Sequence, residues 1–224
     1  MIADGLARIE ERIEQAARRA GRRRDQITLI GVSKTMPATA IEEAYRAGLR
    51  HFGENYVQEF RSKKAQLGEL PGAVFHLIGH LQSNKSGQAA ELFDVIQTVD
   101  SVRLARRLNE TGKALKVLIE VKLALEETKS GVQEAELPAL VDAVRALDRL
   151  ELHGLMVMPP WPEKPADSRP YFQRLREIAA PFGLPELSMG MSGDFEVAIE
   201  EGATMIRVGT AIFGPRKPVA KENA

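Results

Sequence analysis

The sequence predicts a parallel (β/α)8 barrel of the TIM type, formed by one domain over residues 1–224, with an extra helix at its N-terminus. Eight short apolar runs alternate with helical patterns along the chain, which is the repeat of such a barrel. No long stretch rich in proline, glycine or serine divides the chain into two parts. One alternative stays open on this pattern, a doubly wound parallel sheet.

The predicted elements follow from the spacing of apolar residues. An amphipathic helix comes first, because Leu6, Ile9 and Ile13 share one helix face. The predicted strands cover residues 27–32, 50–52, 74–78, 95–99, 115–121, 152–157, 186–188 and 205–208, and the second and seventh have the weakest patterns. The predicted helices lie between them at residues 38–48, 55–67, 84–92, 101–112, 134–148, 168–181 and 194–202.

Two segments fall outside these elements. Residues 158–165 are rich in proline and predict a stiff loop over one mouth of the barrel, with Trp161 as its anchor. Residues 215–224 predict a flexible tail.

Composition narrows the class of ligand. Lysine plus arginine and aspartate plus glutamate each number 31, so no net field points to nucleic acid or to a membrane surface. The arginine run at residues 18–24 follows a helical pattern with three glutamates. We interpret the run as structural, because cations near a helix C-terminus interact favourably with the helix dipole. There is no cysteine, which excludes disulfides and thiolate chemistry. With no leader pattern and no long apolar run, we expect a cytoplasmic protein that binds a small molecule.

Lys34 is the most informative residue. It closes the apolar run of residues 27–33 and precedes a helical pattern. A lysine at the end of a buried strand either reaches solvent, pairs with an acid, loses its proton or forms a Schiff base with a carbonyl.

The ends of the other predicted strands favour a ligand site, because these ends meet at one rim of a barrel. Ser192 and Gly193 follow the seventh strand, and Gly209 and Thr210 follow the eighth, where this fold recurrently binds phosphate. Helix capping by the serine and a simple glycine turn are the alternative interpretation.

Two more polar residues lie within predicted strands. Alternation puts Arg207 on the same face as Gly209, so an inward guanidinium would meet either a ligand or an acid. His76 in the third strand is typical of a satisfied core histidine, and no acidic cluster beside it indicates a metal site.

One mouth of the predicted barrel thus holds a phosphate site and a lysine that can form a Schiff base. Two kinds of ligand suit this combination. Pyridoxal 5'-phosphate (PLP) carries both an aldehyde and a phosphate. A sugar phosphate bound by a cofactor-free Schiff-base aldolase also fits, and the spacing does not separate the two.

The motifs resemble those of the pyridoxal phosphate homeostasis proteins. They occur in order along most of the chain, at residues 31–35 (GVSKT), 51–59 (HFGENYVQE), 76–85 (HLIGHLQSNK), 129–131 (KSG), 153–156 (HGLM), 190–194 (GMSGD) and 207–214 (RVGTAIFG).

This resemblance implies a fold type III PLP-binding barrel like the N-terminal domain of alanine racemase, with PLP held on Lys34. It places Ser192, Gly209 and Thr210 at the phosphate and Arg207 near the cofactor. It also implies that Asn55 and His76 line the pocket. Two positions depart from the family pattern: His80 replaces a frequent proline on the rim, and Gly193 replaces a polar residue or alanine while keeping its backbone donor.

The resemblance further implies a monomeric carrier that buffers PLP and delivers it to apo-enzymes, with no settled catalytic activity. The alternative is an amino-acid racemase. Racemisation needs an acid/base on each face of the substrate carbon, and Tyr45, Tyr56 and Tyr171 all fall in helical patterns away from the rim. Only about ten residues follow Gly214, too few for the second domain that racemases of this fold type use. We therefore expect a protein that is not an enzyme.

Overall fold

The computed structural model describes residues 1–123 and 130–214. The tail expected at residues 215–224 and the first residue of the 129–131 motif lie outside the described residues.

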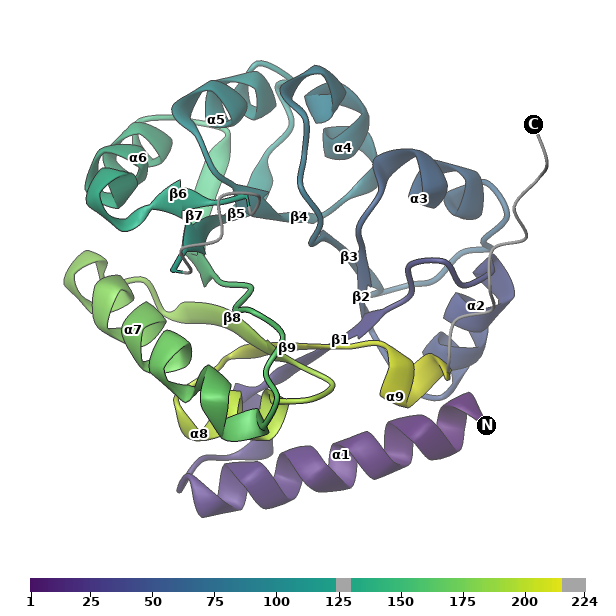
Figure 1. Ribbon diagram of the computed structural model, residues 1–224. Helices are drawn as coiled ribbons and strands as arrows, with labels where there is room; N and C mark the ends of the chain where they lie inside the picture. Colours follow the sequence, from purple (N-terminus) through teal and green to yellow (C-terminus); the bar gives the residue numbers. More distant parts are fainter. Residues whose placement is uncertain (124–129, 215–224) are drawn as a thin grey trace, which may run out of the picture.

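Eight parallel strands form a closed barrel, which confirms the predicted fold class (Figure 1). The strands of the ring are β1 (Thr28–Val32), β2 (His51–Glu54), β3 (Val74–Leu77), β4 (Val95–Val99), β5 (Leu115–Lys122), β7 (Leu150–Met156), β8 (Glu186–Met191) and β9 (Met205–Val208). Neighbours pair in the order β4-β3-β2-β1-β9-β8-β7-β5, and pairing of β4 with β5 closes the ring. The short β6 (Val132–Gln133) pairs with β5 beside the ring.

Helices surround the ring (Figure 1). They are α1 (Ile2–Arg19), α2 (Ala38–Arg46), α3 (Val57–Lys64), α4 (Ser86–Leu92), α5 (Val102–Asn109), α6 (Leu137–Arg145), α7 (Arg169–Ala179), α8 (Phe195–Glu200) and α9 (Thr210–Phe213). Short 3-10 turns cover Arg24–Gln26, Ser83–Lys85, Glu134–Glu136, Pro165–Ser168 and Ala180–Phe182. No helix among residues 1–123 and 130–214 has the length and apolar character needed to cross a bilayer.

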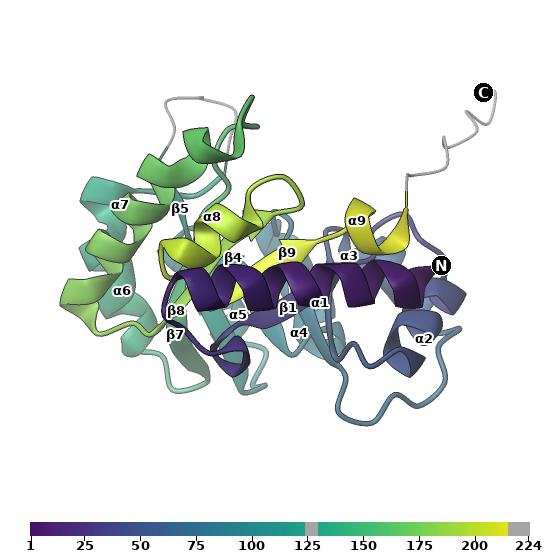
Figure 2. The same ribbon diagram turned by 90° about the horizontal axis from the view of Figure 1, so that it is seen from below.

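The first helix is additional to the barrel repeat, as predicted. It runs across the outside of the barrel and packs against α2, α8 and α9 (Figure 2). The arginine run at residues 18–24, which begins in the last turn of α1, makes structural contacts. Arg19 pairs with Glu200, Arg24 pairs with Glu10, and Arg22 donates to two carbonyl oxygens near the end of α8.

Two strands extend two or three residues beyond their predicted ends, and β5 extends by one residue, to Lys122. We predicted residues 50–52 for the second strand and 186–188 for the seventh, whereas β2 continues to Glu54 and β8 to Met191. The extra residues include Gly53, Glu54 and Gly190, which weaken an apolar pattern. Tertiary contacts stabilise the end of β2, since Glu54 pairs with Lys63 and Gly53 accepts a hydrogen bond from the backbone of Ser33.

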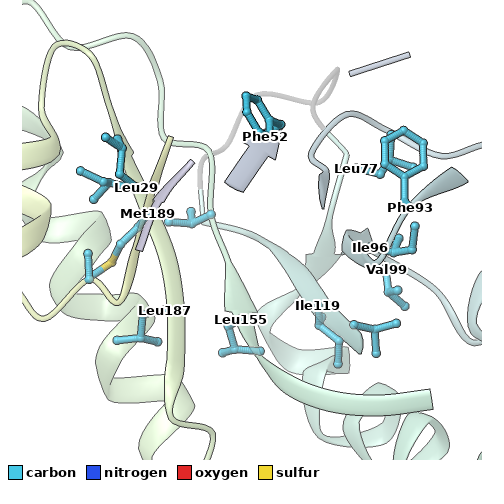
Figure 3. Close-up of a cluster of buried hydrophobic side chains, with 14 of the residues drawn as sticks. Leu29, Phe52, Leu77, Phe93, Ile96, Val99, Ile119, Leu155, Leu187 and Met189 are labelled. Atoms are coloured by element: carbon cyan, nitrogen blue, oxygen red, sulfur yellow. The ribbon is translucent and has the colours of Figure 1, made fainter. Parts of the chain in front are cut away.

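The apolar core has two parts. The larger lies between the outer faces of the strands and the helices, and Figure 3 shows side chains of this layer, among them Leu29, Phe52 and Leu155. The smaller fills part of the barrel interior and consists of Ile30, Val95, Leu118, Met156 and Met205. Because the interior cluster is small, the barrel has room for polar side chains beside it.

Candidate functional site

Six predicted residues meet in one cavity at the carboxyl ends of β1, β2, β8 and β9. This cavity, called the mouth cavity below, has a volume of about 130 Å³. The predicted residues that line it are Lys34, Asn55, Ser192, Arg207, Gly209 and Thr210. The closed ring brings them together from positions as far apart as 34 and 210.

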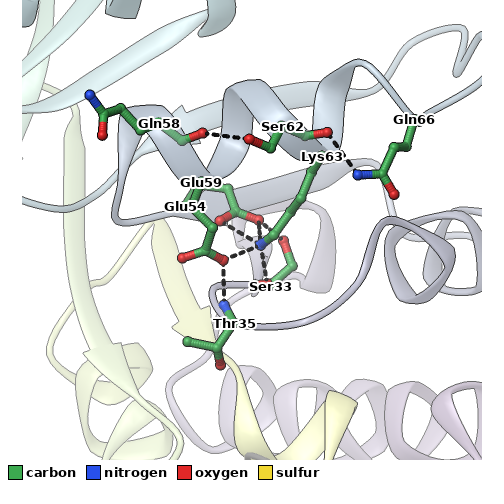
Figure 4. A network of polar contacts seen from close by, with 8 residues as sticks. All are labelled: Ser33, Thr35, Glu54, Gln58, Glu59, Ser62, Lys63 and Gln66. Atoms are coloured by element: carbon green, nitrogen blue, oxygen red, sulfur yellow. Dashed lines mark hydrogen bonds and ion pairs between the residues drawn. The ribbon is translucent and has the colours of Figure 1, made fainter. Parts of the chain in front are cut away.

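Lys34 lies half-buried in the turn after β1, and both of its neighbours are held in place (Figure 4). Ser33 donates from Oγ to Glu54 Oε1 at 2.7 Å. The backbone N–H of Thr35 donates to Glu59 Oε1 at 2.6 Å. Thr35 has a φ of 65°, a left-handed conformation that costs a β-branched residue energy and tends to occur at functional sites. These contacts fix the direction in which the chain presents Lys34.

Lys63 lies at the centre of this network (Figure 4). Its ammonium contacts both carboxylate oxygens of Glu54 at 2.8 and 2.9 Å, Glu59 at 2.6 Å and the carbonyl of Ser33 at 2.8 Å. The Glu54 side chain is fully buried. Burial raises the pKa of the Glu54 carboxyl, while Lys63 and Ser33 oppose that rise. The pair is therefore a structural clamp on the lysine-bearing turn.

The two loops of the predicted phosphate site are joined to each other. Ser192 Oγ accepts a hydrogen bond from the backbone N–H of Gly209 at 3.4 Å. The cap of α8 is Asp194, which accepts from the Met191 N–H at 2.6 Å, so Ser192 is not the capping residue. A Cβ on Gly209 would lie 3.2 Å from the Val32 carbonyl oxygen, so the site needs a small residue there.

Gly193 does not line the mouth cavity. It is exposed at the tip of the loop after β8, and a Cβ built on it would meet nothing within 4 Å. The position therefore tolerates a side chain, which fits the alanine or polar residue expected in relatives.

Arg207 is 3% exposed and faces the barrel interior, as strand alternation predicts. It donates from Nη1 to Ser188 Oγ at 2.6 Å and from Nη2 to the Val157 carbonyl at 2.8 Å. Burial lowers its pKa to about 10. These hydrogen bonds go to neutral oxygens, whereas the alternative considered from the sequence was a carboxylate partner.

Asn55 supplies a buried polar atom that has no hydrogen-bond partner among residues 1–123 and 130–214. Its Oδ1 is buried and accepts no hydrogen bond. Because a buried acceptor without a donor costs free energy, this atom fits a site in which a ligand supplies the donor.

His76 is not brought into the mouth cavity, contrary to the expectation from the resemblance. It is 1% exposed inside the barrel and contacts His51 and Gln97. The reason is the two-residue period of a strand: Ile78, two positions further along, is the residue after β3 that reaches the cavity. His80 lies on the rim beside Asp100, at 3.4 Å, and does not line the cavity either.

Trp161, which was expected to anchor the loop at residues 158–165, has most of its side chain in solvent. It lines the mouth cavity but is 76% exposed, and Met158 beside it on the same loop is 37% exposed. The loop therefore presents apolar surface to solvent at the edge of the site.

Lys63, Gln97 and Ser188 were not among the residues predicted from the sequence. Two signals pointed to some of them. Glu59 and Lys63 are four residues apart on one helix, a spacing typical of an ion pair. Gln97 interrupts an otherwise apolar run, and a buried amide needs partners.

A larger cavity, of about 1320 Å³, lies beside the mouth, outside the barrel. It shares Met36, Thr210, Phe213 and Gly214 with the mouth cavity and is also lined by the start of α1. Lys34, Arg207 and Ser192 line the smaller cavity and not the larger one. Within residues 1–123 and 130–214, no cluster of three or more histidine, aspartate or glutamate side chains could hold a metal ion.

Comparisons with known proteins agree with this geometry. The model of the alanine racemase N-terminal domain matches residues 5–217. The pyridoxal phosphate homeostasis protein of Escherichia coli K12 is 47% identical, over 96% of this chain and 97% of its own. The protein of the same name from Pseudomonas aeruginosa is 46% identical, over 96% of both chains.

Solved structures are also similar to this chain. PipY of Synechococcus elongatus, whose structure has PLP bound, is 42% identical with a TM-score of 0.84, covering 96% of this chain and 100% of PipY. Alanine racemase of Corynebacterium glutamicum is 22% identical with a TM-score of 0.66, covering 99% of this chain and 63% of the racemase, which shows a shared barrel alone. The chain therefore belongs to the pyridoxal phosphate homeostasis protein family and carries the alanine racemase N-terminal domain.

Proposed function

We propose that this protein binds PLP covalently through Lys34 in the mouth cavity and acts as a cytoplasmic, monomeric PLP carrier. It would thereby maintain PLP and amino-acid balance without catalysing a turnover. One observation carries the proposal: an amine, a buried guanidinium and a joined pair of glycine and serine loops line the same cavity.

The residues present fit PLP. Ser192, Gly209 and Thr210 would hold the phosphate, Arg207 would face the ring nitrogen, and the orphan oxygen of Asn55 offers an acceptor. When bound, PLP supplies an aldehyde that condenses with an amine, with loss of one water, and a ring that absorbs light. The Glu54–Lys63 clamp orients the turn that carries Lys34 for this bond.

Arg207 limits the chemistry of the site. With a pKa of about 10 it keeps its proton at neutral pH, and a guanidinium offers donors only. It would therefore donate to the ring nitrogen without transferring a proton to it. The ring withdraws electrons strongly only when its nitrogen is protonated. Arg207 does not supply the acid that would protonate it.

The lining of the mouth cavity supports a carrier over a racemase. Among the described residues that line it, the ionisable ones are Lys34 and Arg207. Tyr56 follows Asn55 but is 59% exposed and does not contribute to the lining. A two-base mechanism needs a second acid/base opposite the lysine, and this lining offers none.

The exposed loop beside the mouth supports delivery of PLP to apo-enzymes. Trp161 and Met158 present apolar side chains next to the cofactor site, and exposed apolar patches are typical of interaction surfaces. A recipient that docks on this loop would approach the bound cofactor directly.

The test is a titration of the purified protein with PLP, followed by absorbance, borohydride reduction and peptide mass spectrometry. We expect a visible band that reduction abolishes, with the reduced adduct on Lys34. The band should be lost in Lys34→Arg, which keeps the charge, and retained in Lys85→Arg, a matched lysine on the rim that does not line the cavity. A protein that forms no band with added PLP would refute binding and favour the aldolase. Separately, stereospecific turnover of an amino acid that depends on Lys34 would refute the carrier role.

A further inference from the structure

A continuous chain of hydrogen bonds crosses the barrel interior from the mouth to the opposite end. Its members come from β9, β8, β4, β3 and β2, and they are far apart in sequence. We call this set the interior chain; it consists of Arg207, Ser188, Gln97, His76 and His51.

The upper half of the interior chain is fully buried. Arg207 Nη1 donates to Ser188 Oγ at 2.6 Å, and Ser188 Oγ donates to Gln97 Oε1 at 2.6 Å. Ser188 and Gln97 have no exposed surface. The upper half therefore connects a residue of the mouth cavity to the middle of the barrel.

The lower half leads to the base of the barrel. Gln97 Nε2 lies 3.0 Å from His76 Nδ1, and His76 Nε2 lies 3.0 Å from His51 Nδ1. His51 is half-buried and lines a cavity of about 460 Å³ at the base, which Glu10, Arg24 and Asp25 also line. His51 thus joins the buried links to a surface cavity that is distinct from the mouth.

With the Gln97 amide oriented as in the structure, Oε1 toward Ser188 and Nε2 toward His76, every bond in the interior chain has one direction. A guanidinium only donates, so the Ser188 hydroxyl accepts from Arg207 and gives its single proton to Gln97 Oε1. The amide nitrogen of Gln97 then faces His76 and donates to Nδ1. Neutral His76 must carry its proton on Nε2 and donate it to His51 Nδ1. The Gln97 amide therefore sets the tautomer of His76, and Arg207 favours that amide orientation through Ser188 without a hydrogen bond to the histidine.

Protonation of His76 to the imidazolium would break this sequence of donors and acceptors. A proton on Nδ1 would point at the amide hydrogens of Gln97, and both groups would be donors. Burial, and secondarily the neighbouring His51, lower the pKa of His76 to about 3, in agreement with a neutral ring.

We propose that the interior chain positions Arg207 for the cofactor and couples that arginine to His51 at the base of the barrel. The cofactor part of this inference rests on the proposed function, whereas the bond order of the chain does not. Ser188, Gln97, His76 and His51 are positioning residues, since none of them lines the mouth cavity. A change at His51 would alter the hydrogen bond from Arg207 to Ser188, and with it the position of the guanidinium, through three intervening side chains.

The first test is nitrogen NMR of the cofactor-free protein labelled with ¹⁵N-histidine. The sequence contains four histidines, so each signal can be assigned by single substitutions. We expect His76 in the neutral form with its proton on Nε2. Ser188→Ala should convert His76 to a mixture of tautomers, although the two residues share no hydrogen bond, and Ser188→Thr should restore the single tautomer because it returns the hydroxyl.

The second test uses bound PLP as the reporter. Ser188→Ala should weaken PLP binding by about tenfold, the size expected when a buried charged donor loses one partner. His51→Leu should shift the absorption maximum of bound PLP, while His153→Leu, a half-buried strand histidine outside the interior chain, should leave it unchanged.

The outcomes separate the two proposals. A His76 proton on Nδ1, or a His76 signal that Ser188→Ala leaves unchanged, would overturn the interior chain whether or not PLP binds. A wild-type protein that fails to bind PLP but shows the expected His76 tautomers would overturn the proposed function and leave the bond order standing. If PLP binds and His51→Leu leaves its absorption unchanged, the coupling to the base is overturned.

Discussion

Replacing Lys63 by methionine tests whether the clamp behind Lys34 stabilises the protein. The substitution keeps the length and apolar stem of the side chain but removes the ammonium. Glu54, with no exposed surface, would keep the Ser33 hydroxyl as a donor and lose its ion pair. Glu59 is 28% exposed and can turn to water, so the penalty falls mainly on Glu54.

Two arguments give the size of the effect. Removing one partner of a buried ion pair costs about 3–5 kcal/mol, because it leaves the other charge uncompensated. The carboxyl can avoid that penalty by taking up a proton. From a reference pKa of about 4.3, protonation at pH 7 costs about 1.4 kcal/mol per pH unit, or about 3.7 kcal/mol in all. We therefore expect Lys63→Met to lower the free energy of unfolding by about 3–4 kcal/mol at pH 7.

The same reasoning gives a pH dependence. In the variant the folded-state pKa of Glu54 lies above its unfolded value, so the penalty grows as pH rises above the unfolded pKa. At pH 5 protonation costs about 1 kcal/mol, and most of the lost stability should return.

Urea denaturation of wild type and variant at pH 7 and pH 5 measures both quantities. Lys64→Met on the exposed side of α3 is the matched control and should cost no more than about 1 kcal/mol. Adding Glu54→Gln to Lys63→Met should recover part of the loss, since it removes the unpaired charge. A loss below about 1 kcal/mol at pH 7, or an equal loss at both pH values, would refute a buried charge pair as the basis of the clamp.

Three further predictions concern the backbone near the site and the barrel interior. Thr35→Gly should raise the free energy of unfolding by up to about 1 kcal/mol in urea denaturation, because glycine adopts the φ of 65° without strain; a clear loss would contradict this. Gly79→Ala should cost about 1–3 kcal/mol and weaken PLP binding, since its Cβ would lie 2.7 Å from Asn55 Cα; Gly87→Ala, with nothing within 4 Å, should not destabilise. His76 binds protons more weakly in the folded state, so its contribution to stability is complete above pH 6.5 and is lost toward pH 3, by up to about 1.4 kcal/mol per pH unit. Denaturation of wild type and His76→Gln across this range should show that the variant lacks this slope, and parallel curves would contradict it.

The barrel was predictable because its signal is local. Each strand is a short apolar run, and strands 95–99 and 205–208 were predicted with the bounds that the structure has. The prediction was less accurate at β2 and β8, where Glu54 and the glycines interrupt the apolar pattern. The end of β2 depends on partners such as Lys63, which a pattern within the strand does not contain.

The position of the site was predictable for a related reason. Parallel strands bring their carboxyl ends to one rim, so Lys34, Ser192 and Gly209 were expected together from strand order alone. His76 was expected in the pocket on resemblance, yet its side chain lies inside the barrel because it is two residues short of the rim position. Strand alternation gives the face of a residue, but the height of that residue in the barrel depends on the register between strands.

By itself the sequence determined the fold class, the mouth that carries the chemistry and the family to which the chain belongs. Only the tertiary structure decided which polar side chains pair inside the barrel. Ser188 and Gln97 are 91 positions apart and His51 and His76 are 25 apart, yet each pair is joined at 2.6 and 3.0 Å respectively. Such bonds depend on inter-strand register and side-chain direction to within tenths of an ångström, whereas the hydropathy pattern records only which side chains avoid water.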